Sequence, residues 1–285
     1  MAVTGALLQK LLKKCREFSL PGKISLLIIF LIFLAAVLAP CISFHSHKIS
    51  SGPALLPPGK GHPLGTDDLG IDLWAQLCHG ARISLLVGFG TAFLAALGGG
   101  LVGIIAGYAG GWVDKVIMRL IDIMIVLPDF PLMIVLAAFL GPSVFNIIIV
   151  LALFSWVFPA RIVRAQILML KEQSFIKAAE TYGAGAWYLL WKHFLPAVFP
   201  LMAVNMIRQT GRAIVSEAGL SFLGLGDPTS KSWGLIINHA TAFRGIYFTE
   251  FWKWWLLYPW LALTLIVLSL AFISRELERI VNPRL

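Results

Sequence analysis

The chain has 285 residues, of which 59% are hydrophobic and only 13% are charged, and its mean hydropathy is +0.85. So few polar side chains cannot cover a soluble domain of this length, and the composition therefore predicts an integral membrane protein. The net charge of +9 does not indicate nucleic-acid binding, because the basic residues form short clusters beside apolar runs, where membrane topology places them.

Residues 1–22 are predicted to form a cytoplasmic N-terminal segment in contact with lipid. Within it, residues 7–17 set leucines against basic side chains, which is the pattern of a short amphipathic helix in the membrane interface. Basic residues before an apolar run also resemble a signal peptide. Because Pro40 stands where a lipoprotein signal has a small residue, and further apolar runs follow, we expect 23–42 to be retained as the first transmembrane helix.

Six apolar runs have the length that a helix needs to cross the hydrocarbon layer, about 20 residues. Basic residues precede the first run, follow the fourth and close the chain, so the positive-inside rule places both termini and the segment 166–196 in the cytoplasm. The prediction is an all-α integral membrane protein with six transmembrane helices. They are expected at 23–42, 82–108, 116–140, 144–165, 197–225 and 253–274, with an extracytoplasmic loop at 43–81, a five-helix core over 82–274 and a cytoplasmic tail at 275–285.

The loop 43–81 is rich in proline and glycine and lacks apolar periodicity, so we expect an ordered loop or a short irregular lobe. Histidines on this side of the membrane would suit a metal ion, but only two of them are close in sequence. Scattered loop histidines are the favoured interpretation, and no metal site is predicted. The residues in question are His45, His47, His62, His79 and His239; the cysteines, Cys15, Cys41 and Cys78, lack metal-ligand spacing, and a Cys41–Cys78 pairing stays open.

The second predicted span carries glycines at helical spacing, among them Gly99, Gly103 and Gly107. Such glycines let neighbouring helices approach closely in lipid, which predicts a packed bundle. The sixth span begins with an aromatic group that is typical of an interfacial belt. It consists of Phe251, Trp252, Trp254, Trp255, Tyr258 and Trp260.

Charged residues inside the spans are costly, so each calls for a partner or a watery cavity. Arg119 and Asp122 are three residues apart and are predicted to form a structural ion pair. Asp129 in the third span is expected at the depth of Arg208 in the fifth, which predicts an ion pair or triad between these spans. The alternative is a polar lining that meets the substrate, and we hypothesise that the arginines face this pathway. The pathway residues are then Asp129, Arg208, Arg212 and, nearer the outer mouth, Glu217.

The segment 166–196 is a polar and aromatic hairpin between two apolar spans. Phe175, Ile176, Ala179 and Tyr182 form one apolar helical stripe, which predicts an amphipathic helix over 174–182. Gly183 can supply the left-handed conformation that ends it. A second stripe of Trp187, Leu190, Trp191 and Phe194 precedes Pro196, so we expect a helix across the membrane face with a sharp joint at each end.

The spacing of this hairpin resembles the cytoplasmic loop motif of ATP-binding-cassette importer permeases. Ala178-Ala179 is followed by Gly183 and, after nine residues, by the sequence His193 to Pro196; Lys177 stands where that motif has Glu. Residues 62–72 and 80–85 are similar to the extracytoplasmic signature of C-type permease subunits for dipeptides, oligopeptides and nickel. Residues 111–122 and 220–234 resemble later segments of the same family.

The resemblance implies a type I importer permease fold and a subunit without catalytic residues. No phosphate-binding loop is present, and 57–61 lacks its first glycine and its hydroxyl residue. ATP and Mg²⁺ would belong to two partner ATPases. The other implied partners are a homologous B-type permease and an extracytoplasmic solute-binding protein, in the plasma membrane of a bacterium or archaeon. Coupling to the ATPases would use Phe175, Lys177, Ala178, Ala179, Glu180, Gly183, Leu195 and Pro196.

Several functions stay open. Import of dipeptides or oligopeptides is favoured, and import of nickel or a metal chelate is the alternative within the same class. A secondary transporter would need a coupling-ion site of its own and would not need a docking helix. A passive channel would transport without any partner.

Overall fold

The computed structural model describes residues 18–281, and every regular element within this range is a helix. The predicted amphipathic helix at 7–17 and the end of the predicted tail lie outside the described residues. The helices are α2 (Leu20–Ile42), α3 (Leu73–Ala109), α4 (Gly111–Val126), α5 (Asp129–Leu140), α6 (Val144–Ser155), α7 (Val157–Lys171), α8 (Ser174–Thr181), α9 (Ala186–Leu189), η1 (Leu190–Phe194), α10 (Leu195–Phe222), α11 (Trp233–Ala242), η2 (Arg244–Tyr247), α12 (Trp252–Trp255) and α13 (Leu257–Val281).

Four helical segments are long and apolar enough to cross a membrane alone: α2, α3, the run Ala186–Phe222 and the run Trp252–Ile280. The third and fourth predicted spans are bent pairs, α4 with α5 at 91° and α6 with α7 at 42°, so six spans result if each pair counts as one. The all-helical fold class is confirmed. The second span begins at Leu73 rather than at 82, because the Asp72 side chain accepts a hydrogen bond from Ala75 N and caps the helix there.

The bend between α4 and α5 lies at Leu127 and Pro128. Proline has no backbone N–H and drives the residue before it away from helical geometry, and Leu127 is extended, with φ −70° and ψ 137°. The third predicted span therefore consists of two helices joined at a sharp bend. The bend makes Asp129 the first residue of α5, where its carboxylate accepts a hydrogen bond from Phe130 N at 2.8 Å.

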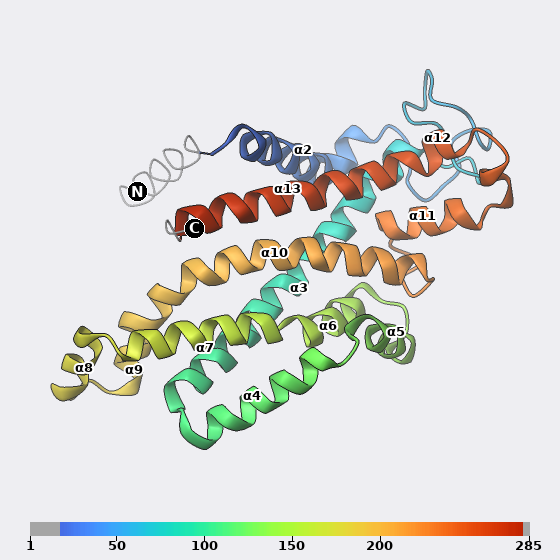
Figure 1. The fold of residues 1–285 in the computed structure, drawn as a ribbon. Helices are drawn as coiled ribbons and strands as arrows, with labels where there is room; N and C mark the ends of the chain where they lie inside the picture. Colours follow the sequence, from blue (N-terminus) through green and yellow to red (C-terminus); the bar gives the residue numbers. More distant parts are fainter. Residues whose placement is uncertain (1–17, 282–285) are drawn as a thin grey trace.

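The long helix α3 is the centre of the bundle and contacts α2, α6, α7 and α10. Figure 1 shows it running diagonally across α7 and α10. A Cβ atom added at Gly99 or Gly103 would lie 2.3 Å and 2.5 Å from the carbonyl oxygens of Trp156 and Ala160. The predicted close approach of helices is thus confirmed, and α3 makes it with the start of α7, at the bend between α6 and α7.

The aromatic group before α13 does not form a continuous interfacial belt. Trp254 and Trp255 are buried in the core with Leu73 and Ile246, whereas Trp252 and Trp260 are exposed. Trp254 and Trp255 of the short helix α12 belong to a core cluster against which Leu55 and Leu64, of the loop between α2 and α3, are packed. The predicted belt is therefore wrong for Trp254 and Trp255.

Candidate functional site

The helix α8 lies at one end of the molecule, below left in Figure 1, and it ends as the sequence predicts. Gly183 has φ +86°, in the left-handed region. Its N–H donates to Glu180 O at 2.9 Å, and Ala184 N donates to Ala179 O at 2.9 Å. This pair of bonds is a Schellman motif, which satisfies the last carbonyls of α8 and turns the chain sharply toward α9.

The inner side of α8 is packed against the ends of the neighbouring helices. Ile176 is 0% exposed and belongs to a core cluster with Ile167, Leu189 and Phe194. Ala179 packs at the edge of the same cluster. Two members of the predicted apolar stripe, Ile176 and Ala179, pack on this core, whereas the other two, Phe175 and Tyr182, are exposed.

Further aromatic side chains are exposed on α9 and η1, and we call them, together with Phe175 and Tyr182, the hairpin patch. The His193 ring lies 5.6 Å from the Phe175 ring and 5.8 Å from the Tyr188 ring, so the two helices share this surface. Exposed apolar groups of this size usually mark contact with a partner or with the membrane. The hairpin patch consists of Phe175, Tyr182, Trp187, Tyr188 and Trp191.

The polar side of α8 carries exposed charges. Lys177 Nζ lies 2.6 Å from Glu172 Oε2, and this hydrogen bond lowers the pKa of Glu172. Glu180 and Ala178 are exposed on the same helix. Exposed ion pairs contribute little to stability, so the pair of Lys177 and Glu172 does little to hold α8 in place.

The second expected joint, at Pro196, is absent. The chain from Ala186 to Phe222 is one continuous helical run, with η1 as a π-helical turn just before the proline. Leu195 N donates a hydrogen bond to Leu190 O, five residues earlier, which is the bond of a π-helical turn. This wider turn lets the helix continue past Pro196, which has no N–H to donate. Leu195 and Pro196 therefore lie within this continuous helical run, which begins at Ala186, shortly after α8 ends.

The predicted ion pair between the third and fifth spans is confirmed for Arg212. Its Nη2 lies 2.5 Å from Asp129 Oδ2, and its guanidinium sits over the Phe158 ring, 5.5 Å from the centroid. Arg208 pairs instead with Glu278 of α13, so the predicted triad is wrong. The bend at Pro128 brings Asp129 to Arg212, and α13 packs along α10 where Arg208 lies.

The predicted pair of Arg119 with Asp122 is also wrong. Asp122 Oδ1 accepts a hydrogen bond from Arg161 Nη2 of α7 at 2.8 Å, and Arg119 forms no ion pair with another described residue. A second pair joins the same helices, since Arg164 holds both oxygens of Asp114, with Nη2 2.6 Å from Oδ2. These two pairs connect α4 to α7.

Glu217 does not line an open path, because its side chain is enclosed within the chain and the residue is 1% exposed. Its carboxylate accepts hydrogen bonds from Ser221 Oγ at 2.6 Å and from Ser84 Oγ at 3.4 Å. Ser84 Oγ also accepts from Trp233 N, at 3.3 Å. Glu217 therefore ties α10 to α3 and to the start of α11, and its assignment to the pathway is wrong.

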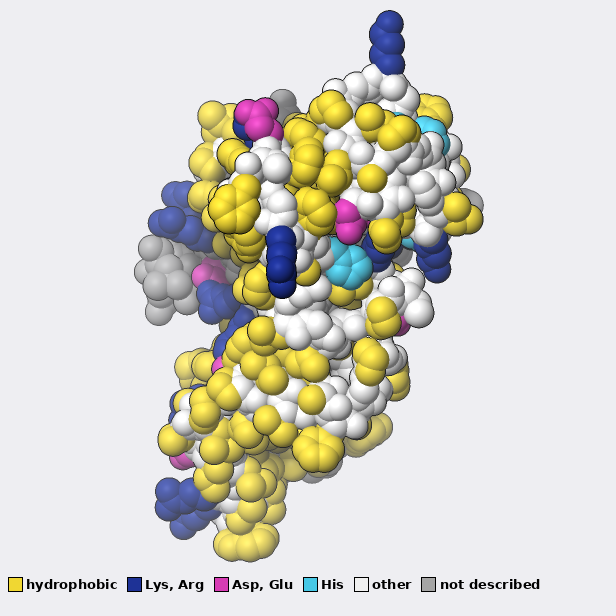
Figure 2. Space-filling model, turned by 90° about the vertical axis from the view of Figure 1, so that its right-hand side faces the viewer, with side chains coloured by type: hydrophobic (Ala, Val, Ile, Leu, Met, Phe, Trp, Pro, Cys, Tyr) yellow, Lys and Arg dark blue, Asp and Glu magenta, His cyan; other side chains and the backbone are white. Residues whose placement is uncertain are grey.

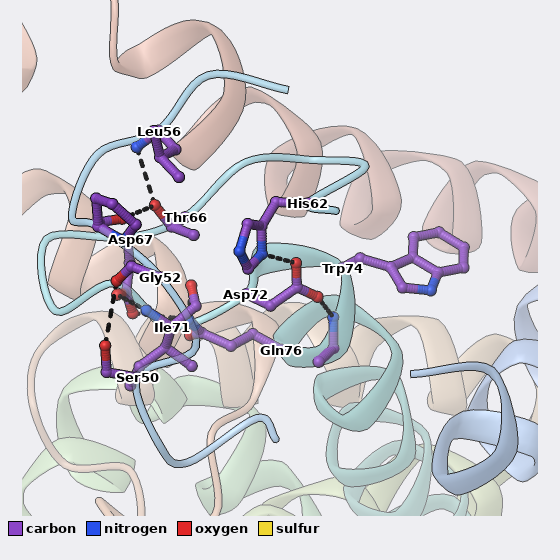
Figure 3. A network of polar contacts seen from close by, with 12 residues as sticks. Ser50, Gly52, Leu56, His62, Thr66, Asp67, Ile71, Asp72, Trp74 and Gln76 are labelled. Carbon is purple, nitrogen blue, oxygen red and sulfur yellow. Dashed lines mark hydrogen bonds and ion pairs between the residues drawn. The ribbon is translucent and has the colours of Figure 1, made fainter. Parts of the chain in front are cut away.

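The loop between α2 and α3 is ordered around two aspartates (Figure 3). Asp67 Oδ1 accepts from Ile71 N at 2.8 Å and from Leu69 N at 2.9 Å, and its Oδ2 accepts from Gln76 Nε2 at 2.7 Å. Lys231, just before α11, donates to Gln76 Oε1 at 3.2 Å. The loop is thus fastened both to α3 and to the segment that leads into α11.

The loop histidines are not scattered. His45 stacks on His62, with ring centroids 4.6 Å apart, and His47 stacks on His79, with centroids 3.8 Å apart. Burial, followed by the His79 charge, lowers the pKa of His47 to about 4. Cys41 and Cys78 are both free thiols and do not pair. No sequence spacing indicated the histidine pairs, because they join different loop segments and the start of α3.

The end of the molecule that carries α11 is shown in Figure 2, with histidine, acidic and basic side chains in the middle of a surface with large apolar areas. The charges of Asp68, in the loop before α3, and His239 of α11 influence each other. Burial raises the pKa of Asp68, and burial together with the Lys231 charge lowers the pKa of His239. Both groups are thus held nearer to neutrality than in water.

Comparison with known proteins gives a consistent result. Residues 99–285 match the protein family described as binding-protein-dependent transport system inner membrane component. The chain is 38% identical over 238 residues to the oligopeptide transport system permease protein OppC of Bacillus subtilis (strain 168), covering 83% of this chain and 76% of that protein. It is 35% identical over 265 residues to the dipeptide transport system permease protein DppC of the same organism, covering 91% of this chain and 81% of that protein.

Proposed function

Because the chain belongs to the family of binding-protein-dependent transport system inner membrane components, we propose that it forms half of the pathway of an ATP-driven importer for dipeptides or oligopeptides. The two relatives named above carry oligopeptide and dipeptide transport in their names, and these names favour a peptide over nickel or a metal chelate. The ATP would be hydrolysed by separate subunits.

The hairpin patch carries this proposal. Its aromatic side chains are exposed, and two of them, Phe175 and Tyr182, lie on or at the end of α8, whose inner residue Ile176 is 0% exposed and whose end is fixed by the Gly183 turn. A rigid helix that presents aromatic side chains outward suits a cleft in another protein better than a mobile segment would. We place this cleft on a cytoplasmic ATPase.

The same geometry supplies a lever. The core cluster that holds Ile176 also contains Ile167 of α7 and Phe194 of η1. A displacement of α8 would therefore move two neighbouring helical segments directly, α7 and the segment that contains η1. The segment with η1 is part of the continuous helical run Ala186–Phe222. ATP-driven movement of the partner would thereby tilt α7 and α10 and open the pathway to alternate sides.

A second permease subunit would cover the face that carries Arg212 and Asp129. Both side chains are close to half exposed in the single chain, although they lie in segments that cross the membrane. Charges facing lipid are costly, by about 2.5–3.5 kcal/mol each on insertion scales. A water-filled pathway between two permease subunits removes this cost. The α11 end would then face outward, toward a solute-binding protein.

The assembled transporter in lipid vesicles tests the coupling. We expect Tyr182→Glu to abolish the ATP hydrolysis that loaded binding protein stimulates, because the charge would enter the contact with the ATPase. Tyr182→Phe is the matched control, since it keeps an aromatic ring at this position, which is 91% exposed, and adds no charge. Equal loss in both variants, or uptake of peptide against a gradient without ATP, would contradict the proposal.

A further inference from the structure

We propose that His45 and His62, supported by Asp72, form a binding site for a divalent transition-metal ion such as Zn²⁺ between the loop that leaves α2 and the start of α3. One potential ligand atom from each of these three residues lies within 4.8 Å of the others. Among the described residues this is the one group of three metal-ligating side chains that is so close. The inference is independent of the proposed transport function.

The hydrogen bonds of Asp72 determine which nitrogen of His62 is available. Asp72 Oδ2 accepts from Ala75 N at 2.9 Å, and Asp72 Oδ1 lies 2.8 Å from His62 Nδ1 (Figure 3). A carboxylate oxygen can only accept here, so Nδ1 carries the proton and the lone pair resides on Nε2. Carboxylates orient metal-binding histidines in this way.

The Nε2 side of His62 is free of protein donors. Within the described residues the His62 ring bonds only to Asp72, and the His45 ring makes no hydrogen bond. The neighbour of Nε2 is Gly52, and a Cβ added to that glycine would lie 2.8 Å from this nitrogen. The absence of a side chain at Gly52 therefore keeps the metal-facing nitrogen accessible, although the residue His62 is only 8% exposed.

His45 supplies the second imidazole. Its ring lies over that of His62 with an interplanar angle of 27°, so the two rings share one site although they come from different loop segments. Two nitrogens on one zinc ion are about 3.4 Å apart, given bonds of about 2.0–2.1 Å and tetrahedral geometry. His45 stands on the loop and is only partly buried, so rotation of its side chain can close the remaining gap.

The donor set points to Zn²⁺, Ni²⁺ or Cu²⁺ and away from Ca²⁺ or Mg²⁺, which take oxygen ligands. Two imidazoles with a carboxylate behind one of them leave coordination positions open for water. A bound ion would fasten the exit of α2 to the N-terminus of α3. The competing explanation is that Asp72 and His62 only cap the helix and that His45 only stacks on the ring.

Zinc binding to the purified full-length protein distinguishes the two. After removal of metal with a chelator, equilibrium dialysis against Zn²⁺ should give about one ion per chain, the stoichiometry of one such site. His45→Ala should lose this ion and keep a melting temperature close to that of the wild type in the absence of metal, because the His45 ring makes no hydrogen bond and only stacks on the His62 ring. Asp72→Asn should bind about 10- to 100-fold more weakly, as is usual for residues that orient a ligand.

The controls use the other histidines and the cysteines. His239→Ala and His47→Ala should bind Zn²⁺ as the wild type does, since neither residue belongs to the group of three. The Co²⁺-loaded protein should show no thiolate-to-cobalt band, which excludes the cysteines as ligands. A wild-type protein that retains no Zn²⁺, or a His45→Ala variant that retains it fully, would overturn the proposal.

Discussion

Arg212 of α10 and Asp129 at the start of α5 form an ion pair between residues 83 positions apart, and both side chains are close to half exposed on the single chain. The guanidinium also lies over the Phe158 ring. The pair exists because the third span bends by 91° just before Asp129. If the transport pathway is lined with charges, as we hypothesise, this half-exposed pair is the place to test it.

We expect Arg212→Gln to reduce peptide uptake by the assembled transporter about tenfold or more, the effect of losing one hydrogen bond to a charged group. The amount of protein in the membrane should stay unchanged, because the pair is partly exposed and adds little to stability. Arg161→Gln breaks an Arg–Asp pair of similar exposure between α7 and α4 and serves as the control. A fall in protein amount with normal uptake per molecule would make the Arg212 pair purely structural.

The Gly183 turn gives a prediction about backbone conformation alone. Gly183→Ala should uncouple ATP hydrolysis from transport, because an alanine at φ +86° costs about 1–2 kcal/mol and favours a different exit from α8. No atom lies within 4 Å of the added Cβ, so steric contact with a neighbour is not involved.

Gly185→Ala is the matched variant for this test. Gly185 also has open space around its Cβ position, but its φ is −73°, which alanine adopts readily. The ratio of ATP hydrolysed to peptide transported should rise for Gly183→Ala and stay unchanged for Gly185→Ala. Unchanged ratios in both variants would show that the turn is not needed for coupling.

The contact between α3 and α7 predicts a strong dependence on side-chain volume. Gly103→Ala places a Cβ 2.5 Å from Ala160 O and should destabilise the protein by about 1–3 kcal/mol, as overpacking usually does. Gly98→Ala on the same helix meets nothing within 4 Å and should be neutral or stabilising, since alanine favours a helix over glycine. The melting temperatures of the two variants in detergent check this difference.

The enclosed Glu217 predicts a requirement for hydrogen bonding rather than for charge. Glu217→Gln keeps an oxygen for the Ser221 hydroxyl and an amide for Ser84 Oγ, so it should fold and transport close to normally. Glu217→Leu leaves both hydroxyls without their acceptor in a buried place and should lose about 1–3 kcal/mol of stability for each. Loss of transport in Glu217→Gln at normal stability would assign the carboxylate a direct role.

The sequence by itself determined the features that depend on a short stretch of chain. Apolar runs give the six spans, because the membrane thickness fixes how many apolar residues a helix needs. The glycines of α3 indicated close packing, and Gly183 indicated the end of α8, because each depends on local spacing or on one backbone angle. The hairpin motif is likewise local and was readable without a structure.

Only the tertiary structure decided which residues meet. Asp122 pairs with Arg161 rather than Arg119, Arg208 pairs with Glu278, and the loop histidines form stacked pairs. Each of these choices depends on where helices cross and bend, and a charge takes the nearest opposite charge in space rather than along the chain. The continuous helix through Pro196 has the same origin, because the π-helical turn just before the proline, which packs in a core cluster through Phe194, lets the helix continue past it.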